Sequence, residues 1–64
     1  MNVKIARIRK GLTQKQLCEI VKTSPRKLVA IERGNVEMVT LGLAGRIAKA
    51  LDSTIEELFL SDEE

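Results

Sequence analysis

The stretch TQKQLCEIVKTSPRKLVAIERG, residues 13–34, contains the start signals of two helices in close succession. Thr13 and Gln16 form a capping box, in which the threonine hydroxyl accepts a bond from the Gln16 amide and the glutamine side chain returns one. Ser24 and Pro25 form the second start, because serine is a good N-cap and proline fits the first helical position, where its missing N–H costs nothing. The stretch therefore predicts two short helices joined by a tight turn.

Helix punctuation of the same kind recurs along the whole chain. Gly11 and Gly34 can take the left-handed conformation that ends a helix. Thr40 is an N-cap, and Thr54 with Glu57 is a second capping box. No segment alternates apolar and polar residues as a half-buried strand would. We therefore expect an all-α protein, a single domain over residues 1–64, with five short helices at about residues 2–10, 13–21, 25–33, 41–51 and 55–60.

The apolar residues of these segments recur at helical spacing. The expected buried stripe is Ile5, Ile8 and Leu12 in the first helix, and Leu17, Cys18 and Val21 in the second. In the third helix, the residues expected to face inwards are Leu28, Ile31 and Glu32. Those left for the outside are Arg26, Lys27, Val29, Ala30 and Arg33. The outward face of the third helix is thus mainly basic.

Composition limits the classes of function. The chain has 64 residues, of which 44% are hydrophobic and 31% are charged, a balance typical of a small globular domain. Histidine is absent and Cys18 is the only cysteine, so the residues that usually build metal sites, acid–base sites and internal disulfides are missing. The chain has no long apolar run and no signal-peptide core. We expect a soluble, cytoplasmic, non-enzymatic protein without metal, cofactor, membrane or small-molecule partner.

The net charge of +2 hides a strong asymmetry. Residues 1–33 hold nine basic side chains and two acids, a balance of +7, whereas residues 34–64 hold two basic side chains and seven acids, a balance of −5. A basic half beside an acidic half indicates a polyanion partner on the first and a solvated or partner-facing surface on the second. A mixed, solvated surface explains the same charges, so charge alone leaves both interpretations open.

Four fragments of the chain occur in the order and spacing of a known motif. They are GLTQ at residues 11–14 with Leu17, Ser24 with Leu28 and IERGN at residues 31–35, IAKAL at residues 47–51, and ELF at residues 57–59. Together they resemble the Cro/CI-type helix-turn-helix family, also called the Xre family. The resemblance implies a five-helix, lambda-repressor-like domain that binds double-stranded DNA as a transcriptional regulator, a repressor rather than an activator. It also implies a homodimer that places two recognition helices about 34 Å apart on a near-palindromic operator.

In this family the third helix reads the major groove. Its base-reading positions fall here on Pro25, Arg26 and Ala30, with Lys27 and Val29 beside them. Of these, only Arg26 can form a bidentate pair with guanine O6 and N7. The resemblance makes Gln14 a phosphate contact that can also brace the third helix. The other phosphate contacts that we expect are Lys10, Thr13, Lys15, Ser24 and Arg33. Arg7 and Glu32 match a family salt bridge that joins the first helix to the recognition helix.

The chain departs from the family in the turn, in the recognition helix and in the loop that follows it. Lys22 stands at a turn position that is usually glycine, so either a left-handed conformation there carries strain or the turn differs slightly from that of the family. Pro25 replaces a polar reader and cannot hydrogen-bond a base. The loop at residues 35–39 has no basic residue with which to clamp a phosphate. These departures weaken the expectation of tight specific binding without changing the expected fold.

The fourth helix departs from the family most. Ala44 and Gly45 replace two large aliphatic residues, and each of its two interior glycines costs about 1 kcal/mol of helix propensity. Close approach of a second copy would compensate that cost, and apolar residues nearby would add to the contact. We expect a homodimer interface formed by Val36, Met38, Val39, Gly42, Leu43 and Gly45. A loosely packed fourth helix is the alternative interpretation.

A second hypothesis keeps the fold and gives up most of the DNA affinity. In it the chain is a protein-interaction or oligomerisation module, either an antitoxin-like partner binder or an engineered assembly. Pro25, Ala30 and the loop without basic residues favour this hypothesis. The +7 balance of residues 1–33 opposes it.

Overall fold

The structure is a computed structural model that describes residues 3–35, 37 and 39–60. Its elements are α1 (Val3–Arg9), α2 (Gln14–Val21), α3 (Pro25–Glu32), α4 (Leu41–Ala50) and a short π-helix, η2 (Glu56–Leu60). No strand occurs in this part of the chain. The all-α prediction with five helices is therefore confirmed, and each expected helix differs from the observed one by only a residue or two at its ends.

Side-chain caps define where the helices begin. Thr13 Oγ1 accepts from the Gln16 amide at 3.0 Å, and the Gln16 side chain accepts from the Thr13 amide at 2.9 Å, which is the predicted capping box. Ser24 caps α3 through the Lys27 amide at 3.2 Å, with Pro25 at the start of the helix. The predicted caps at Thr40 and Thr54 are also present, on the amides of Leu43 and Glu57. Local donors and acceptors therefore decide the helix starts.

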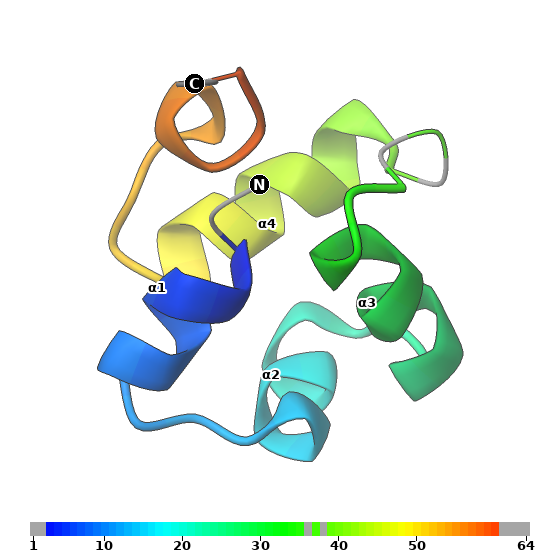
Figure 1. The fold of residues 1–64 in the computed structure, drawn as a ribbon, viewed down its shortest axis with the longest axis vertical. Helices are drawn as coiled ribbons and strands as arrows, with labels where there is room; N and C mark the ends of the chain where they lie inside the picture. The colour runs from blue at the N-terminus through cyan, green and yellow to red at the C-terminus, as the bar shows by residue number, and fades with distance from the viewer. Residues whose placement is uncertain (1–2, 36, 38, 61–64) are drawn as a thin grey trace.

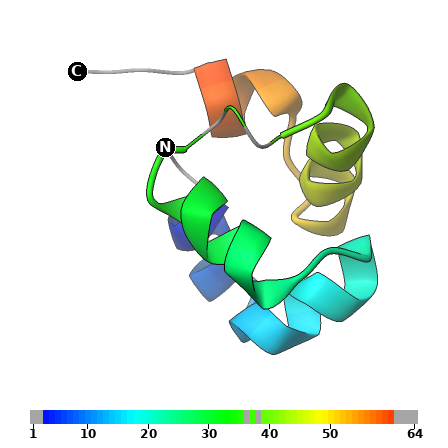
Figure 2. The same cartoon turned by 90° about the vertical axis from the view of Figure 1, so that its right-hand side faces the viewer.

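The helices enclose one aliphatic core. α2 packs against α3 and α4, and α1 packs against α3 and η2. In Figure 1, α2 and α3 lie at one end of the molecule, η2 lies at the other, and α4 runs between them. Figure 2 shows the same order from the side. The largest fully buried side chains come from all five helices: Val3, Leu17, Val21, Leu28, Ile31, Ile47 and Leu58.

The predicted buried stripe of the first helix is wrong for Ile5 and Ile8, whereas Leu12 is half-buried and packs against the core. Ile5 and Ile8 are 51% and 57% exposed, whereas Val3 and Arg7 face the core. Positions 3 and 7 share a face because they are four residues apart on a helix. That face turns inwards because the guanidinium of Arg7 has partners on neighbouring elements, described below. Apolar spacing alone therefore predicts the opposite face of this helix.

Of the two outcomes that the sequence left open for the turn between α2 and α3, the structure has the left-handed one. Lys22 lies in the left-handed region with φ 63° and ψ 53°, where a side chain is strained. Its amide donates to the Cys18 carbonyl, and so does the amide of Thr23, at 3.0 Å. These bonds close α2 and direct the chain into the cap of α3.

Replacing Lys22 by glycine should stabilise the domain, because glycine adopts this conformation without a clash between its side chain and the backbone. We expect the free energy of unfolding to rise by about 0.5–1 kcal/mol, net of the greater freedom of glycine in the unfolded chain. Urea denaturation followed by circular dichroism measures it. Lys22→Ala is the control, since alanine keeps the strain. A glycine variant no more stable than the alanine variant would show that the turn stores no strain.

Candidate nucleic-acid interface

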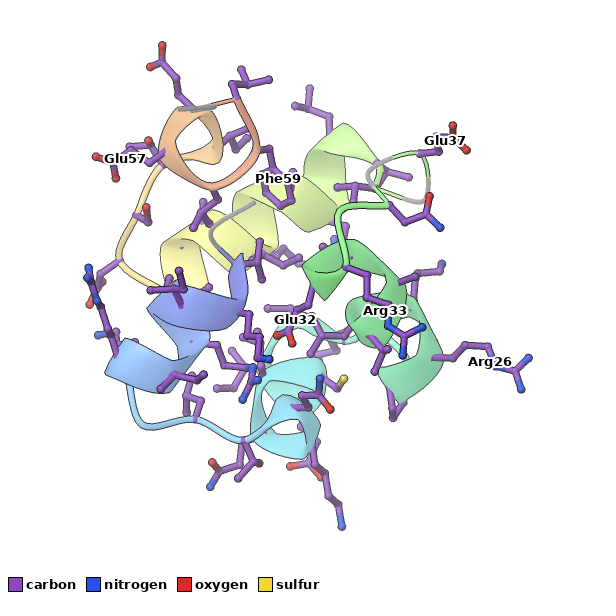
Figure 3. All side chains as sticks on the ribbon, viewed as in Figure 1. Arg26, Glu32, Arg33, Glu37, Glu57 and Phe59 are labelled. Atoms are coloured by element: carbon purple, nitrogen blue, oxygen red, sulfur yellow. The ribbon has the colours of Figure 1, made fainter. Side chains whose placement is uncertain are left out.

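α3 has a basic outer face and an inner face that is anchored in the core. Leu28 and Ile31 are fully buried beneath it. Arg26 and Lys27 are exposed, and Arg26 points away from the body of the molecule in Figure 3. Of the other expected base-reading residues, Pro25 is exposed, and Val29 and Ala30 are half-buried. The long polar side chains that could reach a base edge are thus at the start of the helix.

Glu32 joins three helices at the other end of α3. Its carboxylate accepts from Arg7 Nε at 2.6 Å and from Arg7 Nη2 at 3.3 Å. It also accepts from Gln14 Nε2 at 3.0 Å. The remaining nitrogen of the guanidinium, Nη1, donates to the Leu12 carbonyl at 2.8 Å. The side chains of Arg7 and Glu32 are only 10% and 4% exposed, so this ion pair is largely shielded from solvent.

The ion pair implied by the family resemblance is therefore present, and so is the brace expected from Gln14. Gln14 is the first residue of α2 and braces α3 through Glu32. Its amide side chain is engaged in this bond. A phosphate at the start of α2 would therefore meet first the backbone amides of the first turn, which have no partner inside the helix, and the positive end of the helix dipole.

The remaining expected phosphate contacts fall into three groups. Lys15 and Arg33 are exposed and extend from α2 and from the end of α3. Thr13 and Ser24 accept capping bonds, which leaves each hydroxyl hydrogen to donate to a phosphate oxygen. Lys10 pairs with Asp52 at the surface, so its charge is partly neutralised by a carboxylate before it meets a phosphate.

Comparison with known proteins gives the family. A family model described as helix-turn-helix matches residues 3–58. The chain belongs to the Cro/CI-type helix-turn-helix family. A similar protein, described as an uncharacterized HTH-type transcriptional regulator, comes from Methanothermobacter thermautotrophicus. It is 42% identical over 55 residues, which cover 84% of this chain and 78% of the relative. No solved structure matches the chain significantly.

Membership of the Cro/CI-type family establishes the class of function. Its members are DNA-binding transcriptional regulators and are not enzymes, as the sequence predicted. In the part of the chain that the structure describes, no helix is long and apolar enough to cross a membrane. Within the same residues, no group of three or more cysteine or acidic side chains is placed to hold a metal ion.

Cys18 lies in α2 among core residues and is only 5% exposed. Burial raises the pKa of its thiol, and the negative charges of Glu32 and Glu19 raise it further. The reactive thiolate is therefore disfavoured, and Cys18 acts here as a small packing residue between helices.

The expected dimer interface needs correction at one position. Leu43 is only 4% exposed, since it shares the core face of α4 with Ile47 and Leu51 at four-residue spacing. The apolar residue that α4 does expose is Leu41, at 79%. Gly42 is exposed and Gly45 is half-buried, and a β-carbon at position 45 would meet no side chain or neighbouring element within 4 Å in the described part of the chain. Val39 packs partly against the core, and Val36 and Met38 lie outside the described residues.

The sequence analysis missed Arg46. Its Nε donates to the Val21 carbonyl at 3.0 Å, and so joins α4 to the end of α2. The two residues are 25 positions apart, and no periodic or capping pattern links residues at such a distance. In the sequence, the only local indication of this bond is that Arg46 follows a helix-interior glycine, Gly42, by one turn.

Proposed function

We propose that the chain is a homodimeric, sequence-specific repressor that reads double-stranded DNA with α3 in the major groove. The observation that carries the proposal is the asymmetry of α3. Its inner face is anchored by two buried aliphatic side chains and by the Glu32 bonds, while Arg26 and Lys27 stand free on its outer face. A rigid helix with free guanidinium and ammonium groups is what direct readout of base edges requires.

The roles follow from side-chain chemistry. Arg26 is the base reader, because its planar guanidinium can bind guanine O6 and N7 together. Lys27 binds a second guanine or a phosphate, and Val29 and Ala30 can meet a thymine methyl group. The start of α2, Lys15 and Arg33 hold the phosphate backbone and position α3. The contrast of charge across the molecule orients the approach, since Arg26 and Arg33 lie on the α3 side and Glu37 and Glu57 lie towards the other end (Figure 3).

Repression is the regulatory role that this arrangement serves most simply. A bound dimer blocks access to the DNA that it covers, so occupancy alone is sufficient. Activation would need a further surface that contacts the transcription machinery, and the base-reading and phosphate-binding residues proposed above supply none.

Selection of binding sites from a pool of random duplexes tests the proposal. We expect enrichment of a near-palindromic sequence with half-sites centred about one helical turn apart and at least one conserved G·C pair per half-site. Selected sequences without any shared half-site would contradict specific readout by α3.

The dimer surface that we propose lies on α4 and η2, away from α3. A groove of about 240 Å³ is lined by Val39, Thr40, Leu41, Ala44, Ile55 and Phe59. Phe59 points from η2 towards α4 (Figure 3). Leu41, which lines this groove, is 79% exposed, and Leu60, next to Phe59 in the sequence, is 69% exposed. Together they expose an apolar surface that is large for a small domain. A second copy, related by a twofold axis, covers it while both recognition helices remain free.

Leu41→Lys is expected to dissociate this dimer without unfolding the domain, because the side chain is already exposed in a single copy. Two leucines leave each dimer, so the dimerisation free energy should fall by about 3–6 kcal/mol. Analytical ultracentrifugation measures it. Ile8→Lys is the matched control, since Ile8 is an exposed aliphatic residue on α1, outside the proposed surface. A monomeric parent protein at tens of micromolar, or a dimer that survives Leu41→Lys, would place the interface elsewhere.

A second candidate function is that of a protein-interaction module, and one observation favours it. Ile5 and Ile8 form an exposed aliphatic pair on α1, and Ile5 lines an open groove of about 660 Å³ between α1, the turn after α4 and η2. Protein partners commonly bind such surfaces. The two functions are separated by the selection experiment, since a pure interaction module enriches no DNA sequence.

A further inference from the structure

Arg46 lies on α4, outside the helix-turn-helix, and its bond to Val21 caps the C-terminal end of α2. Val21 is the last residue of α2, and its carbonyl is one of those that a helix leaves without an internal partner. Arg46 Nε satisfies it at 3.0 Å. A cation at this end of a helix is also favoured by the helix dipole. The bond is therefore charge-assisted and lies where the turn begins.

The tethered carbonyl stands directly before the recognition helix. Only Lys22 and Thr23 separate Val21 from Ser24, the N-cap of α3. Lys22 is in the left-handed conformation, which a lysine does not prefer. A short, strained turn has little freedom to absorb a shift of its first carbonyl. The position of that carbonyl consequently sets where α3 starts.

Gly42 leaves space for the arginine. A β-carbon at position 42 would lie 3.7 Å from Arg46 Nη1, which is ordinary van der Waals contact. Alanine would fit there, while a longer side chain would compete for the space of the guanidinium. A helix-interior glycine costs about 1 kcal/mol relative to alanine, and since alanine would fit, the guanidinium does not by itself require glycine at position 42. Gly45 has no such neighbour among the residues that the structure describes.

The two ends of α3 are held by different elements. Glu32 ties its last turn to α1 and α2 through Arg7 and Gln14. Arg26 lies at the opposite end of α3, one residue after Pro25 opens it. At that end the turn is closed by the bond from Arg46. A change in this bond therefore moves the reading end of α3 more than its anchored end.

We propose that Arg46 is a positioning residue for DNA reading, and that it acts by fixing the turn through the Val21 carbonyl without touching DNA. This inference rests on the proposed function, because it assumes that α3 reads bases. It also links α4, on which the proposed dimer surface lies, to the reading end of α3.

The test compares Arg46→Met, Arg46→Lys and Lys49→Met. Methionine keeps the apolar stem and removes the donor and the charge, and lysine restores both. Lys49 is exposed on the same helix, so Lys49→Met matches the loss of charge. Dissociation constants are measured on a selected duplex and on a random duplex at several salt concentrations. All variants are measured under one condition in which circular dichroism shows them folded, with sucrose added equally to all of them if one is less stable.

Arg46→Met should weaken binding to the selected duplex by about fivefold to tenfold, the factor that one net hydrogen bond is worth. Its salt slope should equal that of the parent, and its affinity for random DNA should fall less. Arg46→Lys should recover affinity to within about twofold of the parent, since lysine keeps a charged donor. Lys49→Met should bind as the parent does.

Three results would overturn the inference. Equal affinities of the two methionine variants, both folded, would mean that the bond does not influence reading. A salt slope shallower by about 1.8 for the Arg46→Met dimer, about 0.9 for each copy, would make Arg46 a direct phosphate contact. Dissociation of Arg46→Met into monomers in sedimentation would make its effect one of assembly. In each case binding by the parent protein leaves the proposed function intact, whereas a parent that fails to bind removes that function itself.

Discussion

Glu32→Ala is expected to leave the domain largely unfolded at 37 °C. The substitution removes the acceptor of Arg7 and Gln14 and strands a guanidinium whose side chain is only 10% exposed. Breaking a buried ion pair at one partner costs about 3–5 kcal/mol. A domain of this size has a total stability of about 3–10 kcal/mol, so the loss consumes most of it. Urea denaturation at 10 °C, compared with the parent protein, measures the change.

The double variant Arg7→Met/Glu32→Leu is the control for this prediction. It removes both charges and fills the same space with apolar side chains, so no charge is left unpaired. We expect it to recover at least half of the stability lost by Glu32→Ala. A loss below about 1 kcal/mol for Glu32→Ala would show that solvent already screens the pair, and that it does not anchor α3.

Arg26→Ala is expected to remove discrimination at one base pair of each half-site. An exposed guanidinium that binds guanine bidentately contributes about 1–3 kcal/mol of discrimination, and the dimer carries two of them. Affinity for the selected duplex should therefore fall steeply, while affinity for random duplex falls only by the loss of one charge per copy. Fluorescence anisotropy on both duplexes, and on single-base variants of the selected one, gives the two effects separately.

Two further variants define what Arg26 does. Arg26→Lys keeps the charge and loses the planar fork, so it should lose specificity while retaining affinity for random DNA. Lys15→Ala removes an expected phosphate contact and should weaken all sequences alike. Equal losses of Arg26→Ala on selected and random duplexes would make Arg26 a phosphate contact and move the base-reading role to another residue.

The parts of the fold that the sequence predicted are those specified by local bonds. The caps at Thr13, Ser24 and Thr40 join a side chain to a backbone amide three residues away, so their patterns are visible in the chain itself. The family pattern left two outcomes open at Lys22, a strained left-handed conformation or a slightly different turn, and the structure has the first. The ion pair between Arg7 and Glu32 came from the resemblance alone, because the two residues are 25 positions apart.

The residues whose burial was predicted wrongly have a common physical cause. Ile5 and Ile8 were predicted to be buried from apolar spacing alone, whereas the face of α1 that turns inwards carries the buried, paired Arg7. Leu43 was predicted to lie on the surface, but it belongs to the core face of α4. Both assignments depend on which face a neighbouring helix covers, and that is decided by packing between distant segments. The bond from Arg46 to Val21 is of the same kind.

The measurement that tests the central claim most directly is the salt dependence of binding to duplex DNA. The candidate phosphate contacts on α2, the turn and α3 support about four to six contacts per dimer, so log Kd should rise with log salt with a slope of about 4 to 5 between low and physiological ionic strength. A titration of the unmodified chain against a mixed-sequence duplex provides this slope. Steep weakening with salt is the predicted result, and an affinity that is flat across this range would contradict DNA binding by the α2–α3 face.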